Sequence, residues 1–316
     1  LLLVFTLSSM MICSRISLSD GEIMYEQVLV PLDGSELAEV AIPYAEELGR
    51  RLDSRLVLLA VCESSQREQN QEYLDRIAES LCQNGDKSRL MQVATAIREG
   101  DNPPEEIIAY ADENEIDLTM MATHGRSGIS RWAMGSVADK VVRGTCQPII
   151  LIRAKGSQSD VHPDCMISRI FAPLDGSEAG EAALPYIEEM ALKIDAEVIL
   201  FETVAKQDFA GEVDSLELRK LTKLYSSTYL KGVEQRLINK GISVRCEIRF
   251  EGNPPRQIID LATQTGSAVI AMSTHGRSGV DRWVFGSVAD KVLRAGDTPV
   301  LLIRSPGACS AALRGL

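Results

Sequence analysis

MATHGRSGISRWAMGSVADKVVR (residues 121–143) is the stretch that decides the fold, because it returns as MSTHGRSGVDRWVFGSVADKVLR (residues 272–294) without a gap. The two stretches are identical at 17 of 23 positions. Working outward, VPLDGSE (30–36) is matched by APLDGSE (172–178), and PIILIR (148–153) by PVLLIR (299–304). The offset is 142 residues between 30–36 and 172–178, and 151 residues between the members of each of the other two pairs. A repeat of this length predicts two copies of one domain rather than a solenoid of short units.

The repeat boundaries divide the chain into five parts. We predict a first copy at residues 24–154, a polar linker at 155–165, a second copy at 166–305 and a C-terminal tail at 306–316. We interpret residues 1–23 as an N-terminal extension, either translated in error upstream of Met24 or disordered. A short membrane-targeting segment is the alternative, although the apolar run lacks a preceding basic region.

Strand and helix patterns alternate within each copy. In the first copy, apolar runs predict strands at 27–32, 55–62, 90–98, 117–122 and 148–153. Helical spacing predicts helices at 36–52, 66–83, from Pro103 onward and at 136–143, and a longer helix at about 215–240 in the second copy. This alternation predicts two tandem α/β domains, each a five-stranded parallel sheet with helices on both faces.

Composition excludes several classes of function. The formal net charge is -12, from 45 acidic and 33 basic residues, which speaks against a nucleic-acid surface. Seven cysteines without a CxxC pair favour neither a disulfide framework nor a zinc site, and scattered thiols fit the reducing cytoplasm. We therefore expect a cytoplasmic protein that binds no nucleic acid, membrane or metal cluster.

The repeated loop carries the chemistry. Gly125, Gly128 and Gly135 permit backbone turns with positive φ and close approach of a ligand, and Ser136 begins a helix. Free amide groups and the positive end of the helix dipole favour a phosphate there. Arg126 and Arg277 add nearby positive charge, or else contact the other copy or solvent. A tight strand-to-helix turn without a ligand is the alternative for the whole loop.

Asp33 and Asp175 end the first predicted strand of each copy. In a parallel sheet the carboxyl ends of the strands form the ligand-binding edge. A carboxylate there could accept a hydrogen bond from an adenine amino group. The Asp-Gly-Ser sequence is equally typical of an Asx turn or a helix cap, and both interpretations stay open.

Both copies resemble the universal stress protein family, over about residues 24–153 and 167–304. Nucleotide-binding members carry Gly-x2-Gly-x9-Gly-Ser/Thr after the fourth strand. This chain has Gly125 and Gly276 followed at that spacing by Gly135-Ser136 and Gly286-Ser287, whereas Ala122 and Ser273 replace the first glycine. The resemblance implies an adenine nucleotide alpha hydrolase-like, Rossmann-like fold. It also implies ATP or AMP as ligand, with or without Mg²⁺, and the adenine-side aspartate at Asp33 and Asp175.

The resemblance places an adenine or ribose contact after the core of the second strand, at Val61 and Thr203. The candidate nucleotide-binding residues of the first copy are Pro31, Asp33, Val61, Met121, Ala122, Gly125, Arg126, Gly128, Gly135, Ser136 and Val137. Those of the second copy are Pro173, Asp175, Thr203, Met272, Ser273, Gly276, Arg277, Gly279, Gly286, Ser287 and Val288.

The resemblance also implies dimerisation through the fifth strand, which two fused copies can satisfy internally as a pseudo-dimer along 149–152 and 300–303. A further homodimer and protein partners stay open. We expect His124 and His275 to orient the loops rather than to catalyse, and no catalytic residue can be assigned. Three hypotheses follow: a regulatory adenine-nucleotide-binding stress protein with slow ATP hydrolysis at most, a true nucleotide-dependent enzyme such as an ATPase or kinase, and a scaffold that binds no nucleotide and acts through protein partners.

Overall fold

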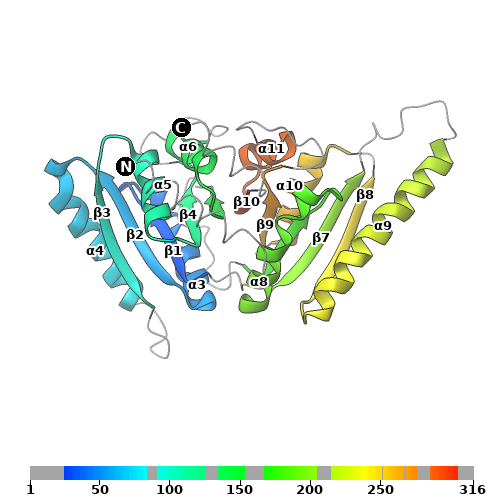
Figure 1. The fold of residues 1–316 in the computed structure, drawn as a ribbon, viewed down its shortest axis with the longest axis horizontal. Helices are drawn as coiled ribbons and strands as arrows, with labels where there is room; N and C mark the ends of the chain where they lie inside the picture. The colour runs from blue at the N-terminus through cyan, green and yellow to red at the C-terminus, as the bar shows by residue number, and fades with distance from the viewer. Residues whose placement is uncertain are drawn as a thin grey trace, which may run out of the picture.

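Two similar α/β units lie side by side and share one continuous sheet (Figure 1). The computed structural model describes residues 25–83, 91–124, 134–153, 167–204, 215–250, 252–266, 268–275 and 285–304. The predicted N-terminal extension, the whole predicted linker and the predicted C-terminal tail lie outside these residues.

Ten strands form the sheet in the order β3-β2-β1-β4-β5-β10-β9-β6-β7-β8. The strands of the first copy are β1 (Gln27–Pro31), β2 (Arg55–Cys62), β3 (Val93–Glu99), β4 (Leu118–Ala122) and β5 (Ile149–Ile152). Those of the second are β6 (Arg169–Pro173), β7 (Glu197–Val204), β8 (Val244–Phe250), β9 (Ala268–Ser273) and β10 (Val300–Ile303). All pairs within a copy are parallel, which confirms the predicted five-stranded parallel sheets.

Helices connect the strands of each copy. The first copy has α2 (Glu36–Glu39), α3 (Ile42–Leu52), a 3₁₀ turn at Ser64–Gln66, α4 (Arg67–Gln83), α5 (Pro103–Glu113) and α6 (Ser136–Gly144). The second has α7 (Glu178–Glu181), α8 (Leu184–Ile194), α9 (Ser215–Asn239), α10 (Pro254–Thr265) and α11 (Ser287–Ala295). The bounds agree with the predicted elements to within a few residues, with one exception.

The helix predicted over residues 36–52 is wrong as a single element. It breaks at Val40–Ala41 into α2 and α3, and Pro43 lies in the first turn of α3. Proline has no amide hydrogen and its ring clashes with the preceding turn, so it starts a helix but does not continue one. Pro185 divides α7 from α8 in the same way.

Two hydrophobic cores cover the two faces of the sheet. Alternate residues of β1 separate into them: Val28 and Val30 pack with α3 and α4, whereas Leu29 packs with α5 and α6. The second copy repeats this division with α8 and α9 on one face and α10 and α11 on the other. Because both faces are buried, the strands read as continuous apolar runs in the sequence.

The two copies join through their fifth strands, as predicted. β5 and β10 pair antiparallel, with Ile150 opposite Leu301. The antiparallel pairing points the carboxyl ends of the strands in the two copies toward opposite edges of the sheet. Each fifth strand therefore pairs on both sides, with no edge exposed at the centre.

Two arginines stabilise the seam, which is the junction of β5 and β10, because each donates hydrogen bonds to the other copy. Arg153 follows β5 and donates to the carbonyl oxygens of Arg294 and Gly296, each at 3.1 Å, at the end of α11. Arg304 follows β10 and donates to the carbonyl oxygens of Val142 and Arg143 at the end of α6. A cation at a helix C-terminus satisfies carbonyl groups that lack intrahelical partners and complements the helix dipole.

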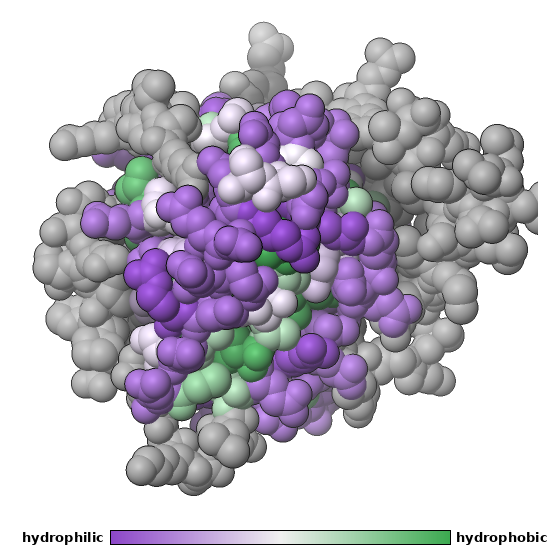
Figure 2. Space-filling model, turned by 90° about the vertical axis from the view of Figure 1, so that its left-hand side faces the viewer, coloured by the Kyte–Doolittle hydropathy of each residue, from purple (hydrophilic) through white to green (hydrophobic). Residues whose placement is uncertain are grey.

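The end of the sheet at edge strand β3 carries a mainly hydrophilic surface. Figure 2 views the molecule from this end and shows hydrophobic side chains only in a limited strip among hydrophilic ones. Arg98 on β3 pairs with Glu113 of α5, and its guanidinium lies 5.2 Å from the centre of the Tyr110 ring. Charged side chains on an edge strand discourage pairing with another sheet.

We expect Ser35→Ala to lower the free energy of unfolding by about 1 kcal/mol. Ser35 caps α2 by accepting a hydrogen bond from the Ala38 amide at 3.2 Å, and alanine cannot do so. Urea unfolding followed by circular dichroism measures the change. An unchanged midpoint would show that this cap contributes nothing, and Ser177→Ala at the matching cap of α7 provides a second measurement.

Candidate functional site

A cavity of about 300 Å³ opens at the carboxyl edge of the first copy's sheet. It lies over β1 and β4, which are neighbours in the sheet although β2 and β3 intervene in the sequence. Ligands of open α/β sheets bind at such a reversal of strand order. Its volume is at the lower end of the range for small-molecule sites, roughly 300–1,000 Å³.

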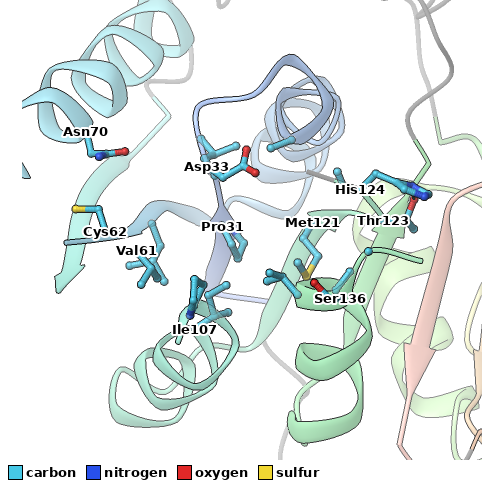
Figure 3. A pocket seen from close by; sticks show the side chains of 18 of the residues that line it. Pro31, Asp33, Val61, Cys62, Asn70, Ile107, Met121, Thr123, His124 and Ser136 are labelled. Carbon is cyan, nitrogen blue, oxygen red and sulfur yellow. The ribbon is translucent and has the colours of Figure 1, made fainter. Parts of the chain in front are cut away.

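The structure brings most of the predicted residues of the first copy together around this cavity (Figure 3). The predicted residues that line it are Pro31, Asp33, Val61, Met121, Ala122, Gly135, Ser136 and Val137. Gly125, Arg126 and Gly128 lie outside the described residues.

Eleven further residues line the cavity. These are Leu32, Ala38, Leu59, Cys62, Gln66, Asn70, Pro103, Ile107, Thr123, His124 and Ala138. Alternation along β2 places Leu59 on the same face as Val61, so this contact could have been found from the strand pattern. Ile107 comes from α5, and only the packing of α5 on the sheet brings it to the cavity.

Asp33 takes part in an Asx turn and also lines the cavity. Its Oδ1 accepts hydrogen bonds from the Ser35 amide at 3.0 Å and the Ser35 hydroxyl at 2.6 Å. Asp175 makes the same two bonds with Ser177, at 3.0 and 2.6 Å. The turn that competed with ligand binding in the sequence therefore exists, and it presents the Asp33 carboxylate to the cavity (Figure 3).

Gly135 brings the start of α6 against the end of β4. Its amide donates to the Thr123 carbonyl oxygen at 2.7 Å. A Cβ at this position would lie 3.0 Å from the same oxygen, closer than nine in ten real Cβ contacts. The expectation of positive φ is wrong here, because φ is -59° at Gly135 and -54° at Gly286. Close approach of two backbone segments, rather than left-handed geometry, is what requires these glycines.

The N-terminus of α6 faces the cavity. Its N-cap is Gly135, which has no side chain to satisfy the first amide groups of the helix. The residues of that first turn, Ser136, Val137 and Ala138, all line the cavity. The arrangement offers an anion backbone donors together with the positive end of the helix dipole.

The wall of the cavity opposite α6 is mainly apolar and offers no reactive side chain among its described residues. It is formed by Leu59, Val61 and Cys62 of β2 with Ile107 of α5. Burial raises the pKa of the Cys62 thiol, and the nearby Glu99 carboxylate raises it further. The thiol is therefore protonated at neutral pH and is a poor nucleophile.

His124 is held by its neighbour. Its Nδ1 lies 3.0 Å from the Thr123 hydroxyl, and the Thr274–His275 pair has the same distance. Within the described part of the chain, the buried Nε2 atom of His124 has no hydrogen-bond partner. If the Thr123 hydroxyl donates to Nδ1, Nε2 carries the proton and is a donor.

The second copy repeats the strands and the helix of the site, but some of the side chains differ. Ser273 replaces Ala122 and accepts a hydrogen bond from the His275 amide at 3.4 Å. Thr203 replaces Val61, and its hydroxyl donates to the side-chain oxygen of Gln257. Pro173, Met272, Gly286, Ser287 and Val288 occupy the positions of their first-copy counterparts on β6, β9 and α11. Gly276, Arg277 and Gly279 lie outside the described residues.

The described residues contain no group of three or more His, Cys, Asp or Glu side chains placed to hold a metal ion. No helix among them combines the length and hydrophobicity needed to cross a membrane.

The fold and the cavity define a tandem Rossmann-like α/β protein with a candidate anion site at the N-terminus of α6. Residues 24–153 and 166–304 each match the model of the Universal stress protein family. The chain therefore belongs to the universal stress protein family, with two such domains in tandem.

Individual relatives support this placement. A universal stress protein of Methanocaldococcus jannaschii is 31% identical over 144 residues, which are 45% of this chain and 84% of the relative. A universal stress protein of Mycobacterium tuberculosis is 25% identical over 196 residues, 60% of this chain and 63% of the relative, so the match spans less than two thirds of that relative. The crystal structure of a functionally unknown protein from Pseudomonas aeruginosa aligns with a TM-score of 0.67 and 18% identity. That alignment covers 94% of this chain and 98% of the other, and it shows the shared fold.

Proposed function

We propose that this protein binds an adenine nucleotide, ATP or AMP, in the first-copy cavity and acts as a regulatory stress-response protein in the cytoplasm. The observation that carries the proposal is the meeting of the uncapped α6 N-terminus and the Asp33 carboxylate in one cavity. A nucleotide combines an anionic end with a base that carries hydrogen-bond donors, and the cavity offers one partner for each.

The phosphate end belongs at α6. The amide groups of its first turn point along the helix axis toward the cavity, and the close contact of Gly135 with Thr123 holds them there. The Ser136 residue also lines the cavity at this end, and its hydroxyl adds a donor. Mg²⁺ bound with the nucleotide would be held mainly by phosphate oxygens and water, as is usual for this ion.

We place the base against the apolar wall of the cavity that β2 and α5 form. Leu59, Val61 and Ile107 provide an apolar surface for a planar ring, and Asp33 provides an acceptor for an exocyclic amino group. The Ser35 bonds fix the orientation of the Asp33 carboxylate before any ligand arrives. Such preorganisation lowers the entropy cost of binding.

Regulation fits this site better than rapid catalysis. An efficient ATPase needs a group that positions the attacking water and cations that stabilise the transition state. Among the described lining residues, no side chain can be assigned to the water-positioning role, and the predicted Arg126 lies outside them. The described cysteines Cys62, Cys82 and Cys246 are free thiols, which supports a reducing compartment.

Co-purifying nucleotide and calorimetry test the proposal. The purified protein is denatured, the supernatant is resolved by ion exchange at 260 nm, and the stripped protein is titrated with ATP and AMP. We expect one of these nucleotides to be released and to rebind. If none is released and none binds up to millimolar concentration, the protein is a scaffold. Turnover above roughly one per minute, although below the usual enzyme range, would favour the ATPase.

Asp33→Asn separates the turn from ligand recognition. Asparagine keeps an oxygen that can accept the Ser35 bonds, so we expect the melting temperature to stay near that of the wild type. Loss of the charge-assisted bond to the base should weaken nucleotide binding about tenfold, or about 1.4 kcal/mol. Calorimetry and thermal unfolding measure the two effects. Unchanged affinity, with Asp33→Ala unchanged as well, would assign Asp33 to the turn alone.

A further inference from the structure

The two copies differ at the floor of the site. Leu59, which lines the first-copy cavity, pairs with Pro31 in the sheet, and the residue that pairs with Pro173 is Phe201. The Phe201 side chain is fully buried, and its ring centre lies 5.3 Å from that of Phe171. The second copy thus has a phenyl ring at the strand position where the first copy has the smaller side chain of leucine.

The side wall differs as well. Val61 has no hydrogen-bonding group, whereas its counterpart Thr203 donates to the Gln257 carboxamide on the first full turn of α10. Glu106 is the first-copy counterpart of Gln257, and each side chain fills the space beside the preceding glycine: a Cβ would lie 2.8 Å from Glu106 at Gly100 and 1.9 Å from Gln257 at Gly252. The copies therefore differ at this wall in the hydrogen bond, not in the filling of that space. The hydrogen bond thus ties α10 to β7 across the wall that the base would need.

The strand position between Phe201 and Thr203 also differs between the copies. Glu202 of β7 is 3% exposed and occupies the position of Ala60 in the first copy. Burial, followed by the carboxylates of Glu181, Glu202 and Asp175, raises the pKa of the Tyr229 hydroxyl. The second copy therefore buries an acidic residue at a strand position where the first copy has alanine.

We infer that the two copies are functionally unequal: the first copy holds one adenine nucleotide per chain, and the second copy is closed by Phe201 and the Thr203–Gln257 hydrogen bond. This inference rests on the proposed function and adds its stoichiometry and its specificity-determining residues. The second copy then serves as the structural partner that completes the continuous sheet through β10.

Equilibrium dialysis of the full chain with radiolabelled ATP tests the stoichiometry. We expect one ATP per chain, and we expect a photoreactive 8-azido-ATP probe to label peptides of residues 25–153 only. Two ATP per chain, or labelling within residues 167–304, would overturn the inference and leave the proposed function intact. If neither ATP nor AMP binds in the same dialysis, the proposed function is overturned, and the inference with it.

Reciprocal exchange of the floor and wall residues tests the cause. Phe201→Leu with Thr203→Val should open the second copy and raise the stoichiometry from one to two. Leu59→Phe should weaken first-copy binding by about tenfold or more, because the cavity cannot hold both the ring and the base. Val61→Thr with Glu106→Gln introduces the Thr203–Gln257 hydrogen bond into the first copy without overpacking the core. This double variant should also weaken nucleotide binding by the first copy. A stoichiometry that stays at one after Phe201→Leu with Thr203→Val, or full affinity in both first-copy variants, would overturn the assignment of these residues.

Discussion

Gly135→Val should weaken ATP binding by about a hundredfold, equivalent to about 2.7 kcal/mol. A Cβ at Gly135 would already lie 3.0 Å from the Thr123 carbonyl oxygen, and valine adds two methyl groups beyond it. The backbone at φ -59° tolerates valine, so the effect is a collision between segments rather than backbone strain. The start of α6 must move away from β4, and its amide groups move away from the phosphate with it. Isothermal titration with ATP measures the loss.

Gly232→Ala is the matched control for this change. Gly232 lies on α9, where a Cβ would have no neighbour within 4 Å. Replacing a glycine within a helix should stabilise the protein by about 0.5–1 kcal/mol and leave ATP affinity unchanged. If Gly135→Val binds ATP within threefold of the wild type while remaining folded, the N-terminus of α6 is not the phosphate site.

Ile150→Asp should lower the free energy of unfolding by more than about 4 kcal/mol. Ile150 is fully buried, and it pairs with the equally buried Leu301 where β5 meets β10. An aspartate there removes apolar packing and places a carboxyl group in the hydrophobic core without a water shell. Urea unfolding, followed by circular dichroism, measures the change if the variant can be purified.

Ile150→Val and Ile150→Ala keep this test quantitative if the aspartate variant does not fold. We expect losses of about 1 kcal/mol for valine and 2–5 kcal/mol for alanine, because each leaves a progressively larger cavity. Arg304→Ala, also at the seam, should cost less than Ile150→Asp, since water can reach the carbonyl oxygens that it releases. A loss below 1 kcal/mol for Ile150→Asp would show that the junction of the copies is not part of the cooperative core.

Local patterns made much of the fold predictable. The apolar runs of β1 and β2 and the helical spacing of α5 follow from which faces must be buried, and burial on both faces of the sheet is visible in the sequence. The break between α2 and α3 was missed, although Pro43 is visible in the sequence. Apolar spacing continues across the break, and the proline signal was outweighed by it.

The candidate site was predictable only in part. Asp33, Gly135 and Ser136 belong to short motifs that repeat, so the sequence identified them. Leu59 could have been found from its alternation with Val61, but Ile107 could not. Its place in the cavity depends on how α5 packs against the sheet, which is a property of tertiary structure.

The sequence by itself determined the duplication, the alternation of strands and helices, and the position of the glycine-serine pair before α6. These features depend on residue identity and on periodicity along a single segment. Only the tertiary structure decided that Gly135 serves close approach to Thr123, that the Asp33 turn faces the cavity, and that the two copies join antiparallel. Each of these depends on contacts between segments far apart in the chain, and the relative placement of such segments follows from packing the whole sheet rather than from any local pattern.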